Sequence, residues 1–283
     1  MEYNIKRNAK VILNVLAGAD KSMVGLRFGQ NTSIIEISEE DFTQIMLMTR
    51  SKKEYNAYSY DIFKHRARIA NNSKNTSFIV METIKTTENM IEDYVIACDL
   101  FKFYKAKDIF SCYQLDYQCN NEINTVCGSG EVRIVKYEHA VDHLPRSYSL
   151  SDEEKENFKE WYNSHVGLVV GLKNQNLKKM IDLYLDSYLV GKVNSSFIML
   201  FVVLEMVYGV NKTNISKNIR KGVSKFLGNN SKEREKIYND IYKLYDDRCK
   251  YVHAGVDVDW DSLFLLRDYV RRVIVKLYDN SKS

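Results

Sequence analysis

The chain has 283 residues and a formal net charge of +4, and hydrophobic and charged residues make up 45% and 28% of it. This is the balance of an ordinary globular protein, and so weak a positive charge does not by itself predict nucleic-acid binding. The single proline excludes a Pro-rich linker. The most apolar run, residues 197–204, is shorter than the about 20 residues that span a bilayer, so we expect no membrane contact. The five cysteines favour free thiols in a reducing compartment, so we expect a cytoplasmic protein.

Residues 1–148 mix strand-like and helix-like patterns. Stretches rich in β-branched and aromatic residues predict strands over residues 10–16, 33–37, 77–84, 112–118 and 131–137. Helices are expected over residues 39–49, where Ser38 is a suitable N-terminal cap, and from residue 87 to about 103, where apolar side chains recur at helical spacing. This part is therefore predicted to be a mixed α+β domain, and we regard it as a candidate sensor or regulatory domain.

Residues 149–283 show only helical patterns. Ser151 and Glu154 have the spacing of a capping box, in which hydroxyl and carboxylate satisfy each other's free backbone N–H groups. Helices are predicted over residues 152–165, 175–189, 195–208 and 214–226, from residue 231 onward, and over 260–278. The segment 195–208 is apolar on nearly every side, so we expect it at the buried centre of a helical bundle. The predicted fold class is α+β, with a domain boundary between residues 148 and 149.

The excess of positive charge lies entirely in the C-terminal part. Residues 1–150 carry 19 basic and 19 acidic side chains, whereas residues 151–283 carry 22 and 18. Residues 211–236 alone contain eight lysines and arginines against two glutamates. A local excess of this kind suits a surface that follows a polynucleotide backbone. The five cysteines show neither a Cys-x-x-Cys pair nor zinc-finger spacing to a histidine, which favours free thiols.

One segment near the C-terminus combines residue types that suit phosphodiester chemistry. Arg248 and His253 lie five residues apart near the end of a predicted amphipathic helix, and Gly255 favours a helix end just beyond them. An imidazole can move a proton near neutral pH, and a guanidinium can hold phosphate oxygens while charge develops. RNA supplies its own nucleophile, the 2′-hydroxyl, so a site without metal or other cofactor would act on RNA and fail on DNA.

The spacing of the two residues leaves their geometry open. On a regular helix, five residues separate two side chains by about 140°. Arg248 and His253 therefore converge on one substrate only if the helix loosens near His253 or if a second copy of the chain completes the site. The alternative is a structural pair, in which the arginine lies at the surface and the histidine stabilises the helix dipole.

The residues around this pair resemble the signature of HEPN domains, specifically the Apea-like branch. In that family the motif reads Tyr-x-x-Arg-Ser-x-x-Val-His-Gly, and four residues match it: Tyr245, Arg248, Val252 and His253. Cys249 stands in place of the serine, and Gly255 lies one residue later than the family's glycine. The apolar segment 197–208, with Glu205 near its end, also resembles the family's central helix. The resemblance covers roughly residues 150–280.

The resemblance implies a metal-independent endoribonuclease in which Arg248 and His253 are catalytic. It also implies a homodimer in which both copies of these residues line one cleft, with RNA, tRNA included, as the substrate and with no cofactor. The family further implies an effector of anti-phage defence, abortive infection or a toxin system, for which a phage-derived molecule would be the trigger. The departure at Cys249 leaves an alternative: a catalytically inactive HEPN-type module for dimerisation or for RNA or ligand binding.

Further residues are candidates for supporting the site or for binding RNA. Glu205 is either a carboxylate that orients Arg248 or a residue at the edge of the bundle. Tyr245, Asp247 and Cys249 lie within the motif beside the pair, and Asp247 also fits a simple surface charge. Contacts to an RNA backbone are expected from a set of basic side chains, whose alternative is a solvated helix face: Lys250, Lys212, Lys217, Arg220, Lys221 and Lys225.

The remaining charged residues and histidines carry weaker signals. Arg267, Arg271 and Arg272 on the last predicted helix are expected to be solvated or to lie at the rim of a dimer. His139 and His143 are one helical turn apart, as in a metal-binding pair, but no third ligand is evident and no metal site is predicted.

Overall fold

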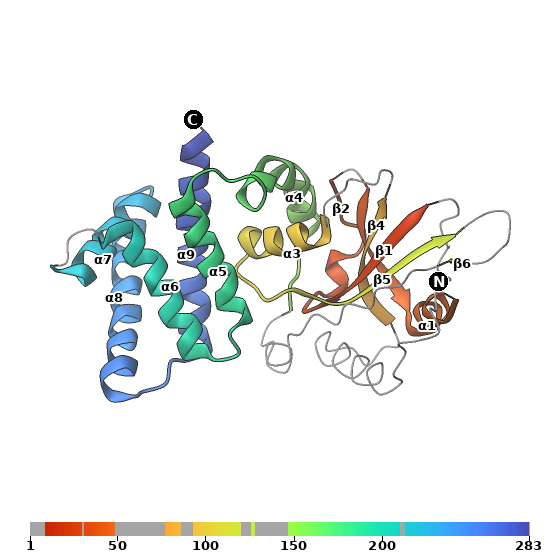
Figure 1. Ribbon diagram of the computed structural model, residues 1–283. Coiled ribbons are helices and arrows are strands. Elements are labelled where there is room, and N and C mark those ends of the chain that lie inside the picture. Colours follow the sequence, from red (N-terminus) through yellow and green to blue (C-terminus); the bar gives the residue numbers. More distant parts are fainter. Residues whose placement is uncertain are drawn as a thin grey trace. The chain divides into compact units, whose positions relative to one another are not determined.

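The computed structural model describes residues 9–29, 31–48, 77–85, 93–119, 126–127, 147–209 and 213–282 (Figure 1). The chain divides into two compact units. The first, residues 1–101 and 107–166, contains the sheet, and the second, residues 102–106 and 167–283, is helical. The predicted α+β fold class is therefore confirmed.

The first unit is built on an antiparallel sheet. Its described strands lie in the order β2 (Arg27–Phe28), β3 (Thr32–Ser38), β4 (Ser77–Lys85), β1 (Lys10–Ala17), β5 (Phe110–Cys119) and β6 (Val126–Cys127). Apart from its first residue, β1 is buried along its whole length, as expected of a strand with neighbours on both sides. The strands predicted over residues 10–16, 33–37, 77–84 and 112–118 are confirmed, and the one over 131–137 lies outside the described residues.

Three α-helices of the described residues belong wholly or mainly to this unit. They are α1 (Glu39–Met48), α3 (Asp93–Tyr104) and α4 (Asp152–His165). The Ser38 hydroxyl accepts a hydrogen bond of 2.9 Å from the Asp41 N–H, which is the predicted cap of α1. Both hydrogen bonds of the capping box at α4 are present: the Glu154 N–H donates to Ser151 Oγ at 3.2 Å, and the Ser151 N–H donates to Glu154 Oε2 at 2.9 Å.

Helix α4 packs on the sheet through an aromatic cluster. The ring of Phe158 in α4 stacks on Phe101 in α3, with centroids 4.5 Å apart, and meets Phe28 in β2 edge-on at 5.5 Å. The segment just before α4 is also tied to the sheet unit, because the Tyr148 N–H donates to the Gly18 carbonyl at 2.6 Å. The division between the units thus falls after α4, whereas the sequence predicts it between residues 148 and 149.

The second unit is a helical assembly. Its long helices are α5 (Gln175–Leu189), α6 (Val193–Tyr208), α7 (Ile215–Leu227), α8 (Ser231–Ala254) and α9 (Trp260–Lys282). Helix α6 packs against all four others, and α9 does the same. These bounds agree with the predicted ones to within a few residues, because helical periodicity and terminal caps are local signals.

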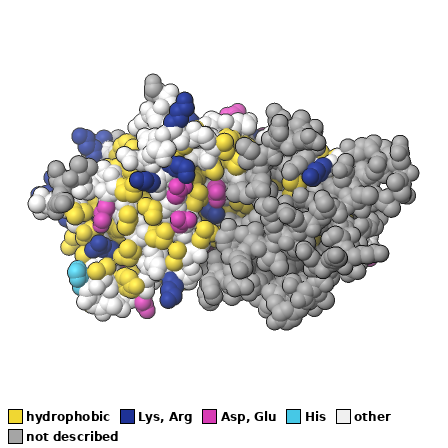
Figure 2. Space-filling view, viewed as in Figure 1, with side chains coloured by type: hydrophobic (Ala, Val, Ile, Leu, Met, Phe, Trp, Pro, Cys, Tyr) yellow, Lys and Arg dark blue, Asp and Glu magenta, His cyan; other side chains and the backbone are white. Residues whose placement is uncertain are grey.

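The burial of α6 is less complete than its composition predicts. Phe197, Leu200 and Leu204 are fully buried, but Val202 is 39% exposed. Other large apolar side chains of this unit also stay at the surface: Leu189, Val252, Val256, Trp260 and Leu265. In the view of Figure 2, hydrophobic side chains are spread over the surface of this unit. One side of α6 therefore lacks a covering element among the described residues. None of the helices that the structure describes has the length and hydrophobicity to cross a bilayer.

Candidate active site

Helix α8 carries the motif and is regular up to its end. The Asn230 side chain caps its start by accepting from the Glu233 N–H at 2.9 Å. At the other end Gly255 adopts a left-handed conformation with φ of 68°, and its N–H donates to the Tyr251 carbonyl at 3.0 Å. The helix therefore ends where the sequence predicts, and it does not loosen before Ala254.

Arg248 lies on the side of α8 that faces α6. Its Nη2 is 3.7 Å from Oε1 of Glu205, and the two side chains are 26% and 31% exposed. Its Cζ lies 5.6 Å from the ring centroid of Tyr245, which meets Phe201 edge-on at 5.5 Å. Burial raises the pKa of Tyr245, and the nearby Arg248 charge opposes this rise. Glu205 thus lies where it can orient the guanidinium, as one of its two interpretations predicts.

The ion pair of Arg248 is incomplete. A distance of 3.7 Å is an ionic contact rather than a hydrogen bond. The buried Nε of Arg248 has no hydrogen-bond partner in the described part of the chain. Buried donors in native structures are nearly always paired, so such a group is a candidate for binding a ligand.

His253 lies in the last turn of α8 and is exposed. Because the helix is regular, its side chain leaves the axis about 140° away from that of Arg248. A distorted helix end, which would let both residues meet on one substrate, is therefore not seen. A second copy of the chain remains as the way to bring the two side chains together. The structural alternative, a histidine at the negative end of a helix dipole, is equally compatible with this position.

Lys250 and Asp247 of the motif have partners close to the end of α8. Lys250 forms a 2.7 Å ion pair with Asp246, and this hydrogen bond raises the pKa of Lys250. Asp247 accepts a 3.3 Å hydrogen bond from the hydroxyl of Ser262 in α9 and lies 3.8 Å from Lys250. Cys249 is a partly exposed free thiol. Asp247 therefore links α8 to α9 rather than contacting Arg248.

The basic residues of α7 divide into two groups. Lys217, Lys221 and Lys225 are exposed. Arg220 is instead held between the helices, because its Cζ lies 4.8 Å and 5.2 Å from the ring centroids of Tyr242 and Tyr238 in α8. The two tyrosines were missed by the sequence interpretation, although their spacing of four residues, one helical turn, beside a basic helix is a usable signal. Lys212 lies outside the described residues.

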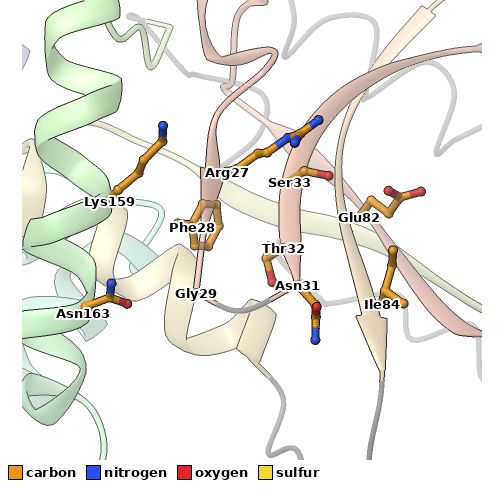
Figure 3. Close-up of a pocket in the computed structure, with 10 residues that line it drawn as sticks. All are labelled: Arg27, Phe28, Gly29, Asn31, Thr32, Ser33, Glu82, Ile84, Lys159 and Asn163. Atoms are coloured by element: carbon orange, nitrogen blue, oxygen red, sulfur yellow. The ribbon is translucent and has the colours of Figure 1, made fainter.

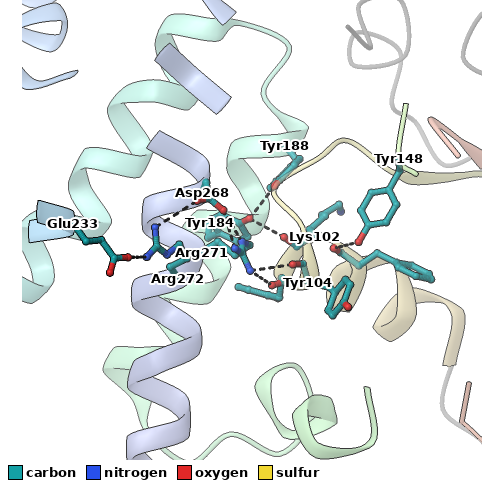
Figure 4. A network of polar contacts seen from close by, with 11 residues as sticks. Lys102, Tyr104, Tyr148, Tyr184, Tyr188, Glu233, Asp268, Arg271 and Arg272 are labelled. Atoms are coloured by element: carbon teal, nitrogen blue, oxygen red, sulfur yellow. Dashed lines mark hydrogen bonds and ion pairs between the residues drawn. The ribbon is translucent and has the colours of Figure 1, made fainter. Parts of the chain in front are cut away.

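The expectation for the arginines of α9 is wrong. Arg267 is 3% exposed and donates to the Ser187 carbonyl at 2.9 Å. Nη1 of Arg271 donates to the carbonyls of Phe103 and Tyr104 at 3.0 Å each, and its Nε and Nη2 both donate to Asp268 (Figure 4). These side chains are neither solvated nor free for a dimer rim.

Arg272 also has a partner within the helical unit. Its Nη2 forms a 3.3 Å ion pair with Glu233 at the start of α8. This arginine is 31% exposed, so it is only partly solvated. Asp268 is a local partner of Arg271. The sequence missed the other acceptors because they are far away along the chain: the carbonyls of Ser187, Phe103 and Tyr104 and the carboxylate of Glu233.

A polar pocket lies in the sheet unit (Figure 3). It has a volume of about 500 Å³ and is lined by residues of β2, β3, β4 and α4 and of the turn between β2 and β3. Arg27, Ser33 and Glu82 are direct neighbours across these three strands, so their side chains lie on one face of the sheet. Lys159 and Asn163 contribute from α4. Such a lining suits a small polar molecule that carries an anionic group.

No cluster of three histidine, cysteine or acidic side chains that could hold a metal ion occurs among the described residues. The His139 and His143 pair lies outside them. Comparison of the chain with protein-family models, with curated proteins and with solved structures finds no match.

Proposed function

We propose that the chain is a metal-independent endoribonuclease of the HEPN type, which acts in the cytoplasm as an anti-phage, abortive-infection or toxin effector. The observation that carries the proposal is the end of α8, where Arg248 lies half-buried beside Glu205 and His253 is exposed. An incompletely paired guanidinium is an anion-binding group, and an accessible imidazole is a proton-transfer group.

The proposed reaction needs only these groups and the RNA. The ribose 2′-oxygen attacks the adjacent phosphorus and the bond to the 5′-oxygen of the next nucleotide breaks, which leaves a 2′,3′-cyclic phosphate and a 5′-hydroxyl. His253 accepts the proton of the 2′-hydroxyl or delivers one to the departing oxygen. Arg248 stabilises the negative charge that develops on the phosphate oxygens.

The proposal includes a homodimer. On the regular helix α8, Arg248 and His253 of one copy point about 140° apart, so they do not face one phosphate together. Two copies that place these residues along one cleft supply both groups to the same substrate. The exposed apolar side chains at the end of α8, Val252 and Val256, are compatible with such a contact.

The test is RNA cleavage in the presence of EDTA. The full-length protein is expected to cut total RNA or tRNA and to leave a strand with 2′-deoxyribose intact. His253→Ala should abolish cutting, whereas Asn239→Ala, an exposed change on the same helix, should not. Equal cutting by the parent and by His253→Ala, or a requirement for a divalent metal, would refute the proposal.

The alternative is an inactive HEPN-type module for dimerisation or for RNA or ligand binding. The observation that favours it is that Arg248 already has a partner in Glu205, while Cys249 replaces the serine of the motif. In that case RNA binding would be measurable without strand cleavage, and toxicity in cells would survive the loss of both Arg248 and His253.

We assign the sheet unit a sensor role, with its polar pocket as the place for a phage-derived trigger. The support is the pocket's lining, in which Arg27 is an exposed cation beside Ser33 and the buried Glu82. Arg27→Ala in the full chain should abolish the response of RNA cleavage to phage infection and leave His253-dependent basal cleavage unchanged. An unaltered response would remove the pocket from the proposal.

A further inference from the structure

The face formed by α7 and α8 combines positive charge with an exposed aromatic side chain. Helix α7 carries four basic side chains and no acidic one over residues 215–227. Tyr242 in α8 is 54% exposed, which makes it the most exposed aromatic side chain of the described residues. Exposed aromatic rings beside basic groups are typical of surfaces that bind single-stranded nucleic acid.

Arg220 holds its guanidinium in place over the Tyr242 ring. Its Nε donates to the Ser216 carbonyl one turn earlier in α7, at 3.2 Å. Its Cζ then lies 4.8 Å from the Tyr242 centroid and 5.2 Å from that of Tyr238. The stack of arginine and tyrosine is therefore organised before any ligand arrives, so little side-chain freedom is lost when a base adds to it.

Lysines surround this stack on the side of α7. Lys217 lies three residues before Arg220 and is therefore its neighbour on the helix surface, and Lys221 lies one turn after Lys217; both lysines are exposed. No ion pair ties either ammonium to another described residue. Their ammonium groups can contact phosphates of a strand that passes along α7, without reading the identity of its bases.

The same face of α8 leads from this stack to the candidate catalytic residue. Tyr242 and His253 are eleven residues apart, which is about three turns and about 16 Å along the axis, and their directions differ by only about 20°. Cys249 lies between them on that face. A strand that stacks a base on Tyr242 and follows α8 therefore reaches the exposed imidazole of His253.

We infer that Tyr242 and Arg220 form a stacking platform for an unpaired base, and that the substrate is single-stranded RNA held along α7 and α8. The inference rests on the proposed ribonuclease function and names its substrate class. In a duplex each base is stacked between its neighbours and paired, so no face is free for Tyr242. Selection of unpaired RNA is a property of this platform and not of Arg248 or His253.

The test uses the full chain with His253→Ala, which removes the proposed cleavage and leaves binding measurable. The probes are a fluorescein-labelled single-stranded RNA and the same strand annealed to its complement. Single-stranded RNA should bind more tightly, and a further Tyr242→Ala change should weaken that binding about tenfold, because stacking one base contributes about 1–3 kcal/mol. Tyr242→Phe keeps the ring and should retain the affinity.

Two controls separate stacking from other effects. Trp260→Ala removes another exposed aromatic side chain of the helical unit, away from α7, and should leave single-strand affinity unchanged. Arg220→Lys keeps the charge but loses the planar group, so it should weaken single-strand binding. Thermal unfolding of Tyr242→Ala close to that of the parent shows that the loss of binding is not a loss of fold.

The outcomes distinguish this inference from the proposed function. The platform is refuted if Tyr242→Ala in the His253→Ala background binds single-stranded RNA as tightly as His253→Ala alone. It is also refuted if the duplex binds as tightly as the single strand and its affinity falls by the same factor in Tyr242→Ala. Both results would count against the platform even when the wild-type protein cleaves RNA. If single-strand binding depends on Tyr242 but the wild-type protein cuts no RNA, the platform stands and the ribonuclease proposal fails.

Discussion

Two arginines in the helical unit are surrounded in opposite ways. Arg271 in α9 uses Nε and both terminal nitrogens in hydrogen bonds of 2.8–3.1 Å to Asp268 and to the carbonyls of Phe103 and Tyr104. Among the described residues, Arg248 in α8 has one ionic contact of 3.7 Å, and its buried Nε has no hydrogen-bond partner. The bonds of Arg271 use four of the five N–H donors of a guanidinium, so little donor capacity is left for a ligand, whereas Arg248 keeps most of its donors. The difference indicates a stabilising contact at Arg271 and supports the proposal that Arg248 binds a phosphate.

The largest expected effect is the loss of catalysis in Arg248→Ala. RNA cleavage should fall by a factor of about 10²–10³, the usual effect of removing one group that stabilises transition-state charge. Its stability should change by no more than about 1 kcal/mol, because the pair is partly exposed and loose. Denaturant unfolding and a cleavage assay on the same preparation check both. Normal cleavage by Arg248→Ala would show that Arg248, like Arg271, has no role in catalysis.

Next in size is the loss of stability in Arg271→Ala. Two carbonyls at the end of α3 lose their donor, so the free energy of unfolding should fall by about 3 kcal/mol. The matched control is Arg272→Ala on the same helix, whose pair with Glu233 is about one-third exposed and should contribute less than about 1 kcal/mol. Urea unfolding of the two variants side by side gives the difference, and equal losses would contradict the assignment.

A smaller effect is expected from Gly222→Ala at the contact of α6 with α7. A Cβ at residue 222 would come within 2.3 Å of the Tyr208 ring, which must move, so we expect a loss of about 2 kcal/mol. Burial raises the pKa of Tyr208, and its hydroxyl has no hydrogen-bond partner among the described residues. Tyr208→Phe should therefore be neutral. Thermal unfolding of both variants tests whether the ring or the hydroxyl matters.

The smallest effect concerns acid stability. A hydrogen bond from the Asn229 N–H, with the Arg272 charge, holds the pKa of Glu233 below its ordinary value of 4.5. Because the pKa is lower in the folded state, this stabilisation is present above pH 4.5 and is lost as the pH falls through the folded-state pKa. Glu233→Gln should make the free energy of unfolding, measured by urea at several pH values, depend less on pH in that range. An unchanged pH dependence of stability would show that neither the Asn229 N–H nor Arg272 stabilises the Glu233 carboxylate in solution.

The sequence predicted the helices of residues 151–283 well because their signals are local. Ser151 and Glu154 mark one start, and Gly255 marks one end with a left-handed residue. The partners of these helices are not local. Phe158 in α4 packs on Phe28, so no pattern near α4 indicates that it belongs with the sheet unit.

The candidate site was predictable to a similar extent. The sequence left two interpretations of Glu205, because it does not show which side of α6 packs against α8. The structure places Glu205 beside Arg248. The Arg220–Tyr242 stack was missed because it requires the pairing of α7 with α8 in one register. The acceptors of Arg271 are backbone carbonyls, which have no signature in the amino-acid sequence.

The end of α3 has a consequence for any attempt to isolate the helical unit. Its last carbonyls, from Lys102 to Tyr104, accept from the Tyr184 hydroxyl and from Arg271, and residues 102–106 belong to that unit. The unit is thus discontinuous along the chain. A fragment that starts at residue 147 carries Tyr184 and Arg271 without their carbonyl acceptors in α3. Inactivity of such a fragment would therefore reflect a missing structural segment rather than a missing regulator.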